Sequence, residues 1–168
     1  MASVPTWVQR ENDQKANAAR EAEVAAQRSA DAASFIQKRG LGFWDQLATA
    51  LQFNALALEK LEGAELYGSA SKSVTGPEHN IHVRVERRSV KYGPEFRWLN
   101  LWYIPGNSFM RCYYMDQMQP NIELAVIGKP EAGQDILALF DGKRLTADQM
   151  GEDIVRQMAG QVRPRQRR

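Results

Sequence analysis

The chain has 168 residues, of which 43% are apolar and 25% charged, and its formal net charge at pH 7 is +2. This composition is typical of an ordinary soluble globular protein of one domain, long enough to bury a core without disulfides. The single cysteine, Cys112, excludes an internal disulfide and fits a reducing cytoplasm. The N-terminus lacks the basic start and apolar run of a signal peptide, and no apolar run could span a bilayer. We therefore expect a cytoplasmic protein without a membrane segment.

The positive charge is concentrated near the C-terminal end. Residues 163–168 carry four arginines, so the other 162 residues sum to −2. Within them, residues 79–105 carry five bases and two acids, a local charge of +3. We expect residues 163–168 to form a basic, disordered tail that could attract polyanions.

Two helices are predicted before any strand. Residues 4–38 are rich in alanine and contain no glycine, which predicts a long helix with a thin apolar stripe. Residues 43–61 carry larger apolar side chains at helical spacing, as expected for a helix that packs in a core. The Gly-Leu-Gly segment at residues 40–42 is expected to break the chain between the two helices. The sequence therefore predicts a helical arm over residues 1–40 and a compact domain over residues 41–162.

From about residue 64 the apolar period changes from 3.6 to 2, which indicates strands. Six segments separated by turn residues are predicted as strands: 65–72, 80–90, 96–104, 108–116, 121–128 and 135–140. The short connections make neighbouring strands antiparallel. Thr146 then begins a final helix, with Gln149 in the position of a capping box. The predicted fold class is α+β: two N-terminal helices (one long), an antiparallel β-meander of five or six strands, and one C-terminal helix.

Residues 92–114 hold eight of the fifteen aromatic residues, and basic side chains lie among them. Such a cluster is either part of a hydrophobic core or a stacking surface with cations. The Pro-Gly-Asn-Ser turn within it predicts a two-residue hairpin loop. This loop places Trp102 opposite Arg111 for a cation–π contact, and Arg97 opposite Asp116 for an ion pair.

The pairing of this hairpin with the preceding strand has two solutions, which bury opposite faces. With a two-residue loop at residues 93–94, Val85 faces Trp102 and the Trp face is core. With a bulge at this point, Val85 faces Leu101 and the Leu face is core. We favour the Trp face as core, because tryptophan is large and normally well buried. In the second solution seven residues share one open face, the candidate binding face: His82, Arg84, Arg88, Trp98, Trp102, Arg111 and Tyr113.

The sequence contains no recognisable catalytic motif. Its two histidines, His79 and His82, would point to opposite faces of a strand, so they do not converge on one metal ion. Residues 63–68 have the glycine spacing of a phosphate loop, but the lysine that the motif demands is missing. Cys112 lies among leucine and methionine, as inert core cysteines do. We therefore expect no cofactor and no metal, and the sequence favours a protein that is not an enzyme.

Three functions remain open. The first is a small soluble interaction protein that works through protein–protein contacts, with a protein partner or self-association expected through its helical arm. The second is a nucleic-acid-binding module that uses the candidate binding face for stacking and the arginine-rich tail for phosphate contacts. The third is a small-ligand-binding or enzymatic pocket between helix 43–61 and a curved sheet. We favour the first.

Overall fold

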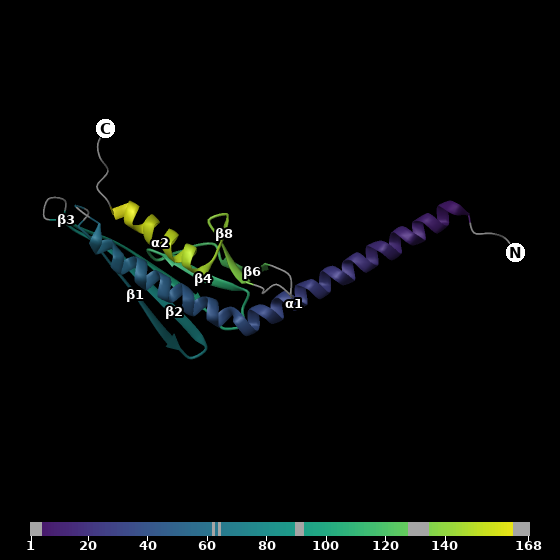
Figure 1. Ribbon diagram of the computed structural model, residues 1–168, viewed down its shortest axis with the longest axis horizontal. Coiled ribbons are helices and arrows are strands. Elements are labelled where there is room, and N and C mark those ends of the chain that lie inside the picture. The colour runs from purple at the N-terminus through teal and green to yellow at the C-terminus, as the bar shows by residue number, and fades with distance from the viewer. Residues whose placement is uncertain (1–4, 62, 64, 90–92, 128–134, 163–168) are drawn as a thin grey trace, which may run out of the picture. The chain divides into compact units, whose positions relative to one another are not determined.

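The computed structural model describes residues 5–61, 63, 65–89, 93–127 and 135–162. A long helix, an antiparallel sheet and a C-terminal helix follow one another along the chain (Figure 1). The elements are α1 (Thr6–Ala57), the 3₁₀ helix η1 (Leu58–Lys60), β1 (Leu66–Thr75), β2 (Glu78–Ser89), β3 (Gly93–Tyr103), β4 (Phe109–Tyr114), β5 (Gln117–Met118), β6 (Ile122–Ile127), β7 (Asp135–Phe140), β8 (Lys143–Leu145) and α2 (Ala147–Val162). The predicted α+β class is confirmed.

Helix α1 runs without a break through residues 40–42, so the prediction of two N-terminal helices is wrong. Gly40 is buried, and a Cβ atom added to it would lie 2.1 Å from the hydroxyl oxygen of Tyr103. About one turn further along, Trp44 stacks on the same tyrosine with the ring centroids 5.5 Å apart. The burial of these aromatic side chains outweighs the helix-propensity penalty of about 1 kcal/mol per glycine. Gly40 therefore permits close packing and does not end the helix.

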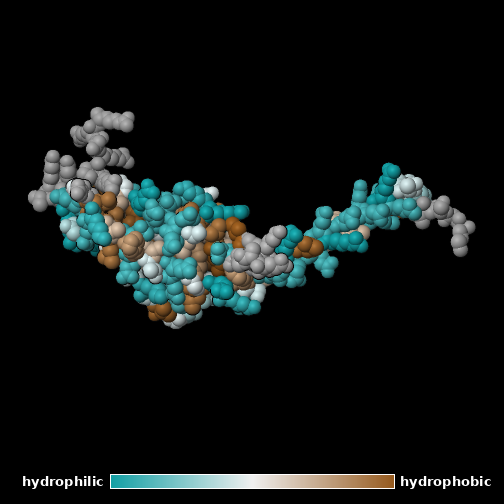
Figure 2. Space-filling model, viewed as in Figure 1, coloured by the Kyte–Doolittle hydropathy of each residue, from teal (hydrophilic) through white to brown (hydrophobic). Residues whose placement is uncertain are grey.

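The chain divides into two compact units between residues 34 and 35. In the first unit, almost all side chains of helical residues 6–34 are exposed, and their surface is mainly hydrophilic (Figure 2). Alanine gives this segment helix propensity with little burial. The second unit has a core of its own, which begins in sequence with Ile36 at 3% exposure. The basic tail predicted at residues 163–168 lies outside the described residues.

The described residues form a sheet of eight strands in the order β1-β2-β3-β4-β6-β7-β8, with β5 paired to β4. All of these neighbours are antiparallel. The predicted count of five or six is too low because β5 and β8 have only two and three residues, too few to show an alternation of period 2. The predicted capping box of α2 is confirmed, since Thr146 and Gln149 exchange hydrogen bonds of 3.1 and 3.3 Å.

The hairpin of β3 and β4 has the predicted register, with Trp102 paired to Arg111. The predicted ion pair between Arg97 and Asp116 does not form. The chain leaves β4 before Asp116, which has a left-handed backbone with a φ of 63°. Arg97 lies 2.6 Å from a carboxylate oxygen of Glu95 on its own strand. The turn therefore fixes the pairing of the strands, but the strand ends too early for the expected ion pair.

The pairing of β2 with β3 buries the Leu face, so the favoured expectation that the Trp face is core is wrong. Arg84 pairs with Trp98, and at the end of the hairpin Ser89 pairs with Gly93. Residues 90–92, which lie outside the described residues, therefore connect the strands in place of a two-residue loop. Val85 pairs with Arg97 and not with Trp102 or Leu101, so neither predicted pairing is correct in detail. The observed register nevertheless buries the same face as the predicted bulge, because side chains alternate along a strand.

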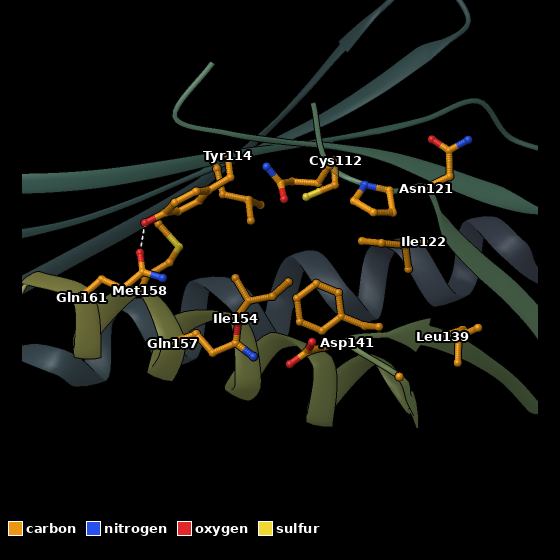
Figure 3. Close-up of a pocket in the computed structure, with 15 residues that line it drawn as sticks. Cys112, Tyr114, Asn121, Ile122, Leu139, Asp141, Ile154, Gln157, Met158 and Gln161 are labelled. Atoms are coloured by element: carbon orange, nitrogen blue, oxygen red, sulfur yellow. Dashed lines mark hydrogen bonds between the residues drawn. The ribbon is translucent and has the colours of Figure 1, made fainter. Parts of the chain in front are cut away.

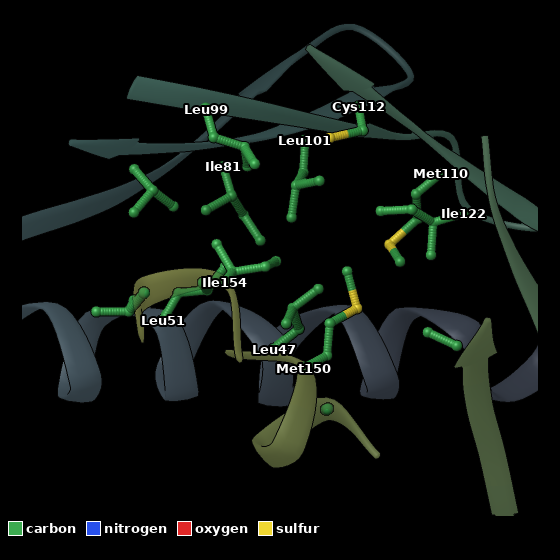
Figure 4. Close-up of a cluster of buried hydrophobic side chains, with 14 of the residues drawn as sticks. Leu47, Leu51, Ile81, Leu99, Leu101, Met110, Cys112, Ile122, Met150 and Ile154 are labelled. Carbon is green, nitrogen blue, oxygen red and sulfur yellow. The ribbon is translucent and has the colours of Figure 1, made fainter. Parts of the chain in front are cut away.

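The core lies between the Leu face of the sheet and the two helices (Figure 4). Gly68 of β1 and Gly151 of α2 allow two close approaches to α1. An added Cβ would lie 2.5 Å from the carbonyl oxygen of Ala55 at the first, and 2.7 Å from Cβ of Ala50 at the second. Helix α2 and the second half of α1 thus pack on the same face. We call the opposite face of β1 to β4, which carries Trp98 and Trp102 and is not covered by a described helix, the outer face.

Candidate functional site

The outer face brings together all seven residues of the candidate binding face. They come from three strands: His82, Arg84 and Arg88 from β2, Trp98 and Trp102 from β3, and Arg111 and Tyr113 from β4. They lie in cross-strand rows, in which Arg84 pairs with Trp98, His82 with Asn100, and Trp102 with Arg111. Strand alternation explains the grouping, since their neighbours along each strand point into the core.

Aromatic rings form the centre of the outer face. Trp98, Trp102 and Tyr113 are each half-buried, and Phe96 beside them is 44% exposed. A shallow depression of about 400 Å³ is lined by Glu78, Trp98, Asn100, Trp102, Arg111, Tyr113 and Asp116. The face therefore presents large apolar surfaces next to hydrogen-bonding groups.

The arginines of the outer face are paired with carboxylates. Arg84 and Arg88 both contact Glu86, the former at 3.0 Å. Arg111 donates a hydrogen bond of 2.7 Å to Glu78. The positive and negative charges of the face therefore largely cancel.

Two aromatic residues of the outer face, Tyr67 and Phe96, are missing from the sequence-based set. The guanidinium carbon of Arg84 lies 4.9 Å from the ring centre of Phe96, and that of Arg88 lies 4.5 Å from that of Tyr67, as in cation–π contacts. The position of Tyr67 on the outer face could have been predicted from the turn at residues 76–77. A two-residue loop there pairs β1 with β2 in the observed register and places Tyr67 on the outer face.

His82 belongs to a polar row on the outer face. Its Nδ1 donates a hydrogen bond of 2.8 Å to the amide oxygen of Asn100, and its ring centre lies 6.1 Å from that of Trp98. Among the residues that the structure describes, no three His, Cys, Asp or Glu side chains are grouped closely enough to hold a metal ion.

A cavity of about 470 Å³ lies on the other side of the sheet, between the Leu face and α2 (Figure 3). A pocket was expected from the sequence between helix 43–61 and the sheet, but the residues that line this cavity were not predicted. Cys112 is in its wall, where burial raises the pKa of the thiol to about 11. A thiol with this pKa is a poor nucleophile near neutral pH, because the reactive species is the thiolate.

In comparisons with known proteins, no family model, curated protein or solved structure matches this chain. Among the described helices, none has an apolar stretch long enough to cross a membrane. The interpretation of function therefore depends on the chemistry of the outer face and of the cavity.

Proposed function

We propose that this chain is an interaction protein that works through protein–protein contacts made by its outer face, and that its partner is a second copy of the chain. The observation that carries the proposal is that Trp98, Trp102 and Tyr113 are only half-buried and lie on a sheet face that no described helix covers. Tryptophan, tyrosine and arginine are the residues that most often dominate the binding energy of interfaces. These three aromatic residues surround one depression together with Arg111, which is a composition typical of an interface centre.

The size of the outer face is sufficient for a stable dimer. Strands β1, β2 and β3 have 10, 12 and 11 residues. Together with β4 they span about 35 Å by about 19 Å, which is about 670 Å². Two such faces together provide about 1,340 Å², which falls within the total of about 1,200–2,000 Å² that interfaces of standard size bury.

The charge pattern favours a second copy over a nucleic acid. Phosphate groups would need arginines available to contact them, whereas Arg84, Arg88 and Arg111 are already paired with Glu78 or Glu86. A second copy presents the same mixture of both signs, so the two faces meet without net repulsion. The exposed aromatic rings are compatible with base stacking, and oligonucleotide binding is therefore the competing outcome.

Sedimentation velocity of the full chain between about 1 and 200 µM tests the proposal. We expect a monomer–dimer equilibrium that Trp102→Ser weakens at least about tenfold, as for a central interface residue. Phe53→Ser is the matched control, because Phe53 is 72% exposed on α1 and does not belong to the outer face. Val24→Ser, at a position in the first unit that is 49% exposed, tests the helical arm in the same way.

A chain that stays monomeric over this range contradicts the proposal. Equal weakening by Trp102→Ser and Phe53→Ser would also contradict it, and loss of the dimer in Val24→Ser alone would assign self-association to the arm. Binding of a single-stranded oligonucleotide at about 50 mM salt by a monomeric chain, lost in Trp102→Ser, would favour the nucleic-acid alternative.

A further inference from the structure

The cavity beneath α2 lies within the second compact unit. Its wall is formed by the Leu face of β3 and β4, the start of β6, the turn after β7 and the C-terminal half of α2 (Figure 3). Its volume of about 470 Å³ falls in the range of about 300–1,000 Å³ that is usual for small-molecule sites. It lies on the other side of the sheet from the outer face, so an inference about it does not depend on the proposed function.

The interior of the cavity is apolar. Side chains from the sheet and from α2 meet there, and each of these five is at most 5% exposed: Leu99, Cys112, Ile122, Ile154 and Met158. An apolar group bound against them would leave water, which is favourable and not directional. The interior therefore selects for an apolar chain without selecting one exact shape.

Uncharged hydrogen-bonding groups surround this interior. Tyr114 donates its hydroxyl hydrogen to the side-chain oxygen of Gln161. Burial raises the pKa of Tyr114, which keeps the hydroxyl protonated at neutral pH. Three more amide side chains line the cavity: Gln119, Asn121 and Gln157. Their oxygens accept hydrogen bonds, so they can receive the N–H groups of a bound molecule.

Asp141 is the only charged side chain among the described residues that line the cavity. Burial raises the pKa of Tyr114, and the nearby Arg97 opposes this effect by lowering it. The guanidinium of Arg97 does not line the cavity and is paired with Glu95 at 2.6 Å. An anionic headgroup would therefore meet a carboxylate and no cation in the described lining. An ammonium headgroup would meet the carboxylate of Asp141.

We propose that this cavity binds a small amphiphile with an apolar chain and a primary ammonium headgroup. The chain lies against the interior formed by the sheet and α2, and the ammonium group lies at the polar edge near Asp141. Binding is non-covalent, in keeping with the protonated, buried thiol of Cys112.

Calorimetric titration of the full chain with octylammonium, octan-1-ol and octanoate tests the headgroup at constant chain length. We expect octylammonium to bind about three to five times more tightly than octan-1-ol, as for a partly exposed charge pair, and at least about ten times more tightly than octanoate. Absence of binding by all three, or octanoate or octan-1-ol binding as tightly as octylammonium, overturns the proposal.

Asp141→Asn identifies the source of the preference. Asparagine tolerates the left-handed backbone of this position, whose φ is 50°, so the variant should fold. It should reduce octylammonium binding to the level of octan-1-ol and leave octan-1-ol binding unchanged. Asp148→Asn is the matched control, because it changes the net charge equally at an exposed position that does not line the cavity. An unchanged preference in Asp141→Asn, or an equal loss in both variants, overturns the assignment to this cavity. Neither variant should alter self-association through the outer face.

Discussion

Replacing Gly40 with alanine tests whether α1 continues through residues 40–42 while packed against Tyr103. The added Cβ would lie 2.1 Å from the tyrosine hydroxyl oxygen, whereas close C···O contacts are about 3.3 Å or longer. Tyr103 is 1% exposed and stacks on Trp44, so its hydroxyl cannot move by more than 1 Å without disturbing the core. The substitution therefore forces an overlap that the surrounding side chains cannot easily relieve.

Two effects oppose each other in Gly40→Ala. Alanine favours a helix over glycine by about 1 kcal/mol, and overpacking a filled core costs about 1–3 kcal/mol. We expect the free energy of unfolding to fall by about 1 kcal/mol, which lowers Tm by about 2–4 °C in a chain of this length. Gly42→Ala is the matched control, because nothing lies within 4 Å of its added Cβ. It should raise the free energy of unfolding by up to about 1 kcal/mol.

Urea unfolding followed by tryptophan fluorescence measures these differences. Tyr103→Phe removes the overlapping oxygen and leaves a ring carbon, at 3.3 Å, as the nearest atom to the added Cβ. Gly40→Ala should therefore cost about 1 kcal/mol less in the Tyr103→Phe background than in the original chain. Equal effects of Gly40→Ala and Gly42→Ala, or no coupling to Tyr103→Phe, would refute the packing of α1 against this tyrosine.

Two other side chains give independent tests. Arg87→Met should lower the free energy of unfolding by about 2–4 kcal/mol in urea titrations. Arg87 is 5% exposed, donates a 2.8 Å hydrogen bond to the carbonyl of Val162 and pairs with Glu95. A change below about 0.5 kcal/mol contradicts this role. With a pKa of about 11, only about one Cys112 thiol in 3,000 is ionised at pH 7.5. A thiol reagent should therefore react on the order of a hundredfold more slowly with the folded chain than in urea, and the native rate should still be rising above pH 9; similar rates in both states contradict the burial.

The β3–β4 hairpin could be predicted from the sequence because its pairing is determined locally. A two-residue turn fixes the register, and Trp102 lies opposite Arg111 as expected. The β2–β3 pairing could not be predicted in the same way, because the sequence placed the turn at residues 93–94, whereas Gly93 and Pro94 pair within the strands. The position and length of the connection decide which face is buried. Since only two faces are possible, the residues of the exposed one could still be named.

Helix α1 and the cavity depend on contacts between distant parts of the chain. Gly40 looks like a helix break until Tyr103, far along the sequence, is placed against it. In the same way, Gln161 of α2 and Tyr114 of β4 carry no motif, and they become part of one cavity only when the helix packs on the sheet. Local patterns therefore predicted the class of the fold, whereas the cavity required its tertiary packing.

Both proposals require that the side chains of β3 face as they do in the structure. Trp102 then lies on the outer face, and Leu99 lies in the wall of the cavity. Variants that keep a single tryptophan measure this direction by acrylamide quenching. At low concentration, quenching of Trp102 should lie between that of Trp44, which is 0% exposed, and that of Trp7, which is 65% exposed. If a second copy covers the outer face, quenching of Trp102 should fall as concentration rises while that of Trp7 stays constant. A Trp102 as protected as Trp44 at every concentration would mean that the Trp face is core, and both proposals would then be wrong.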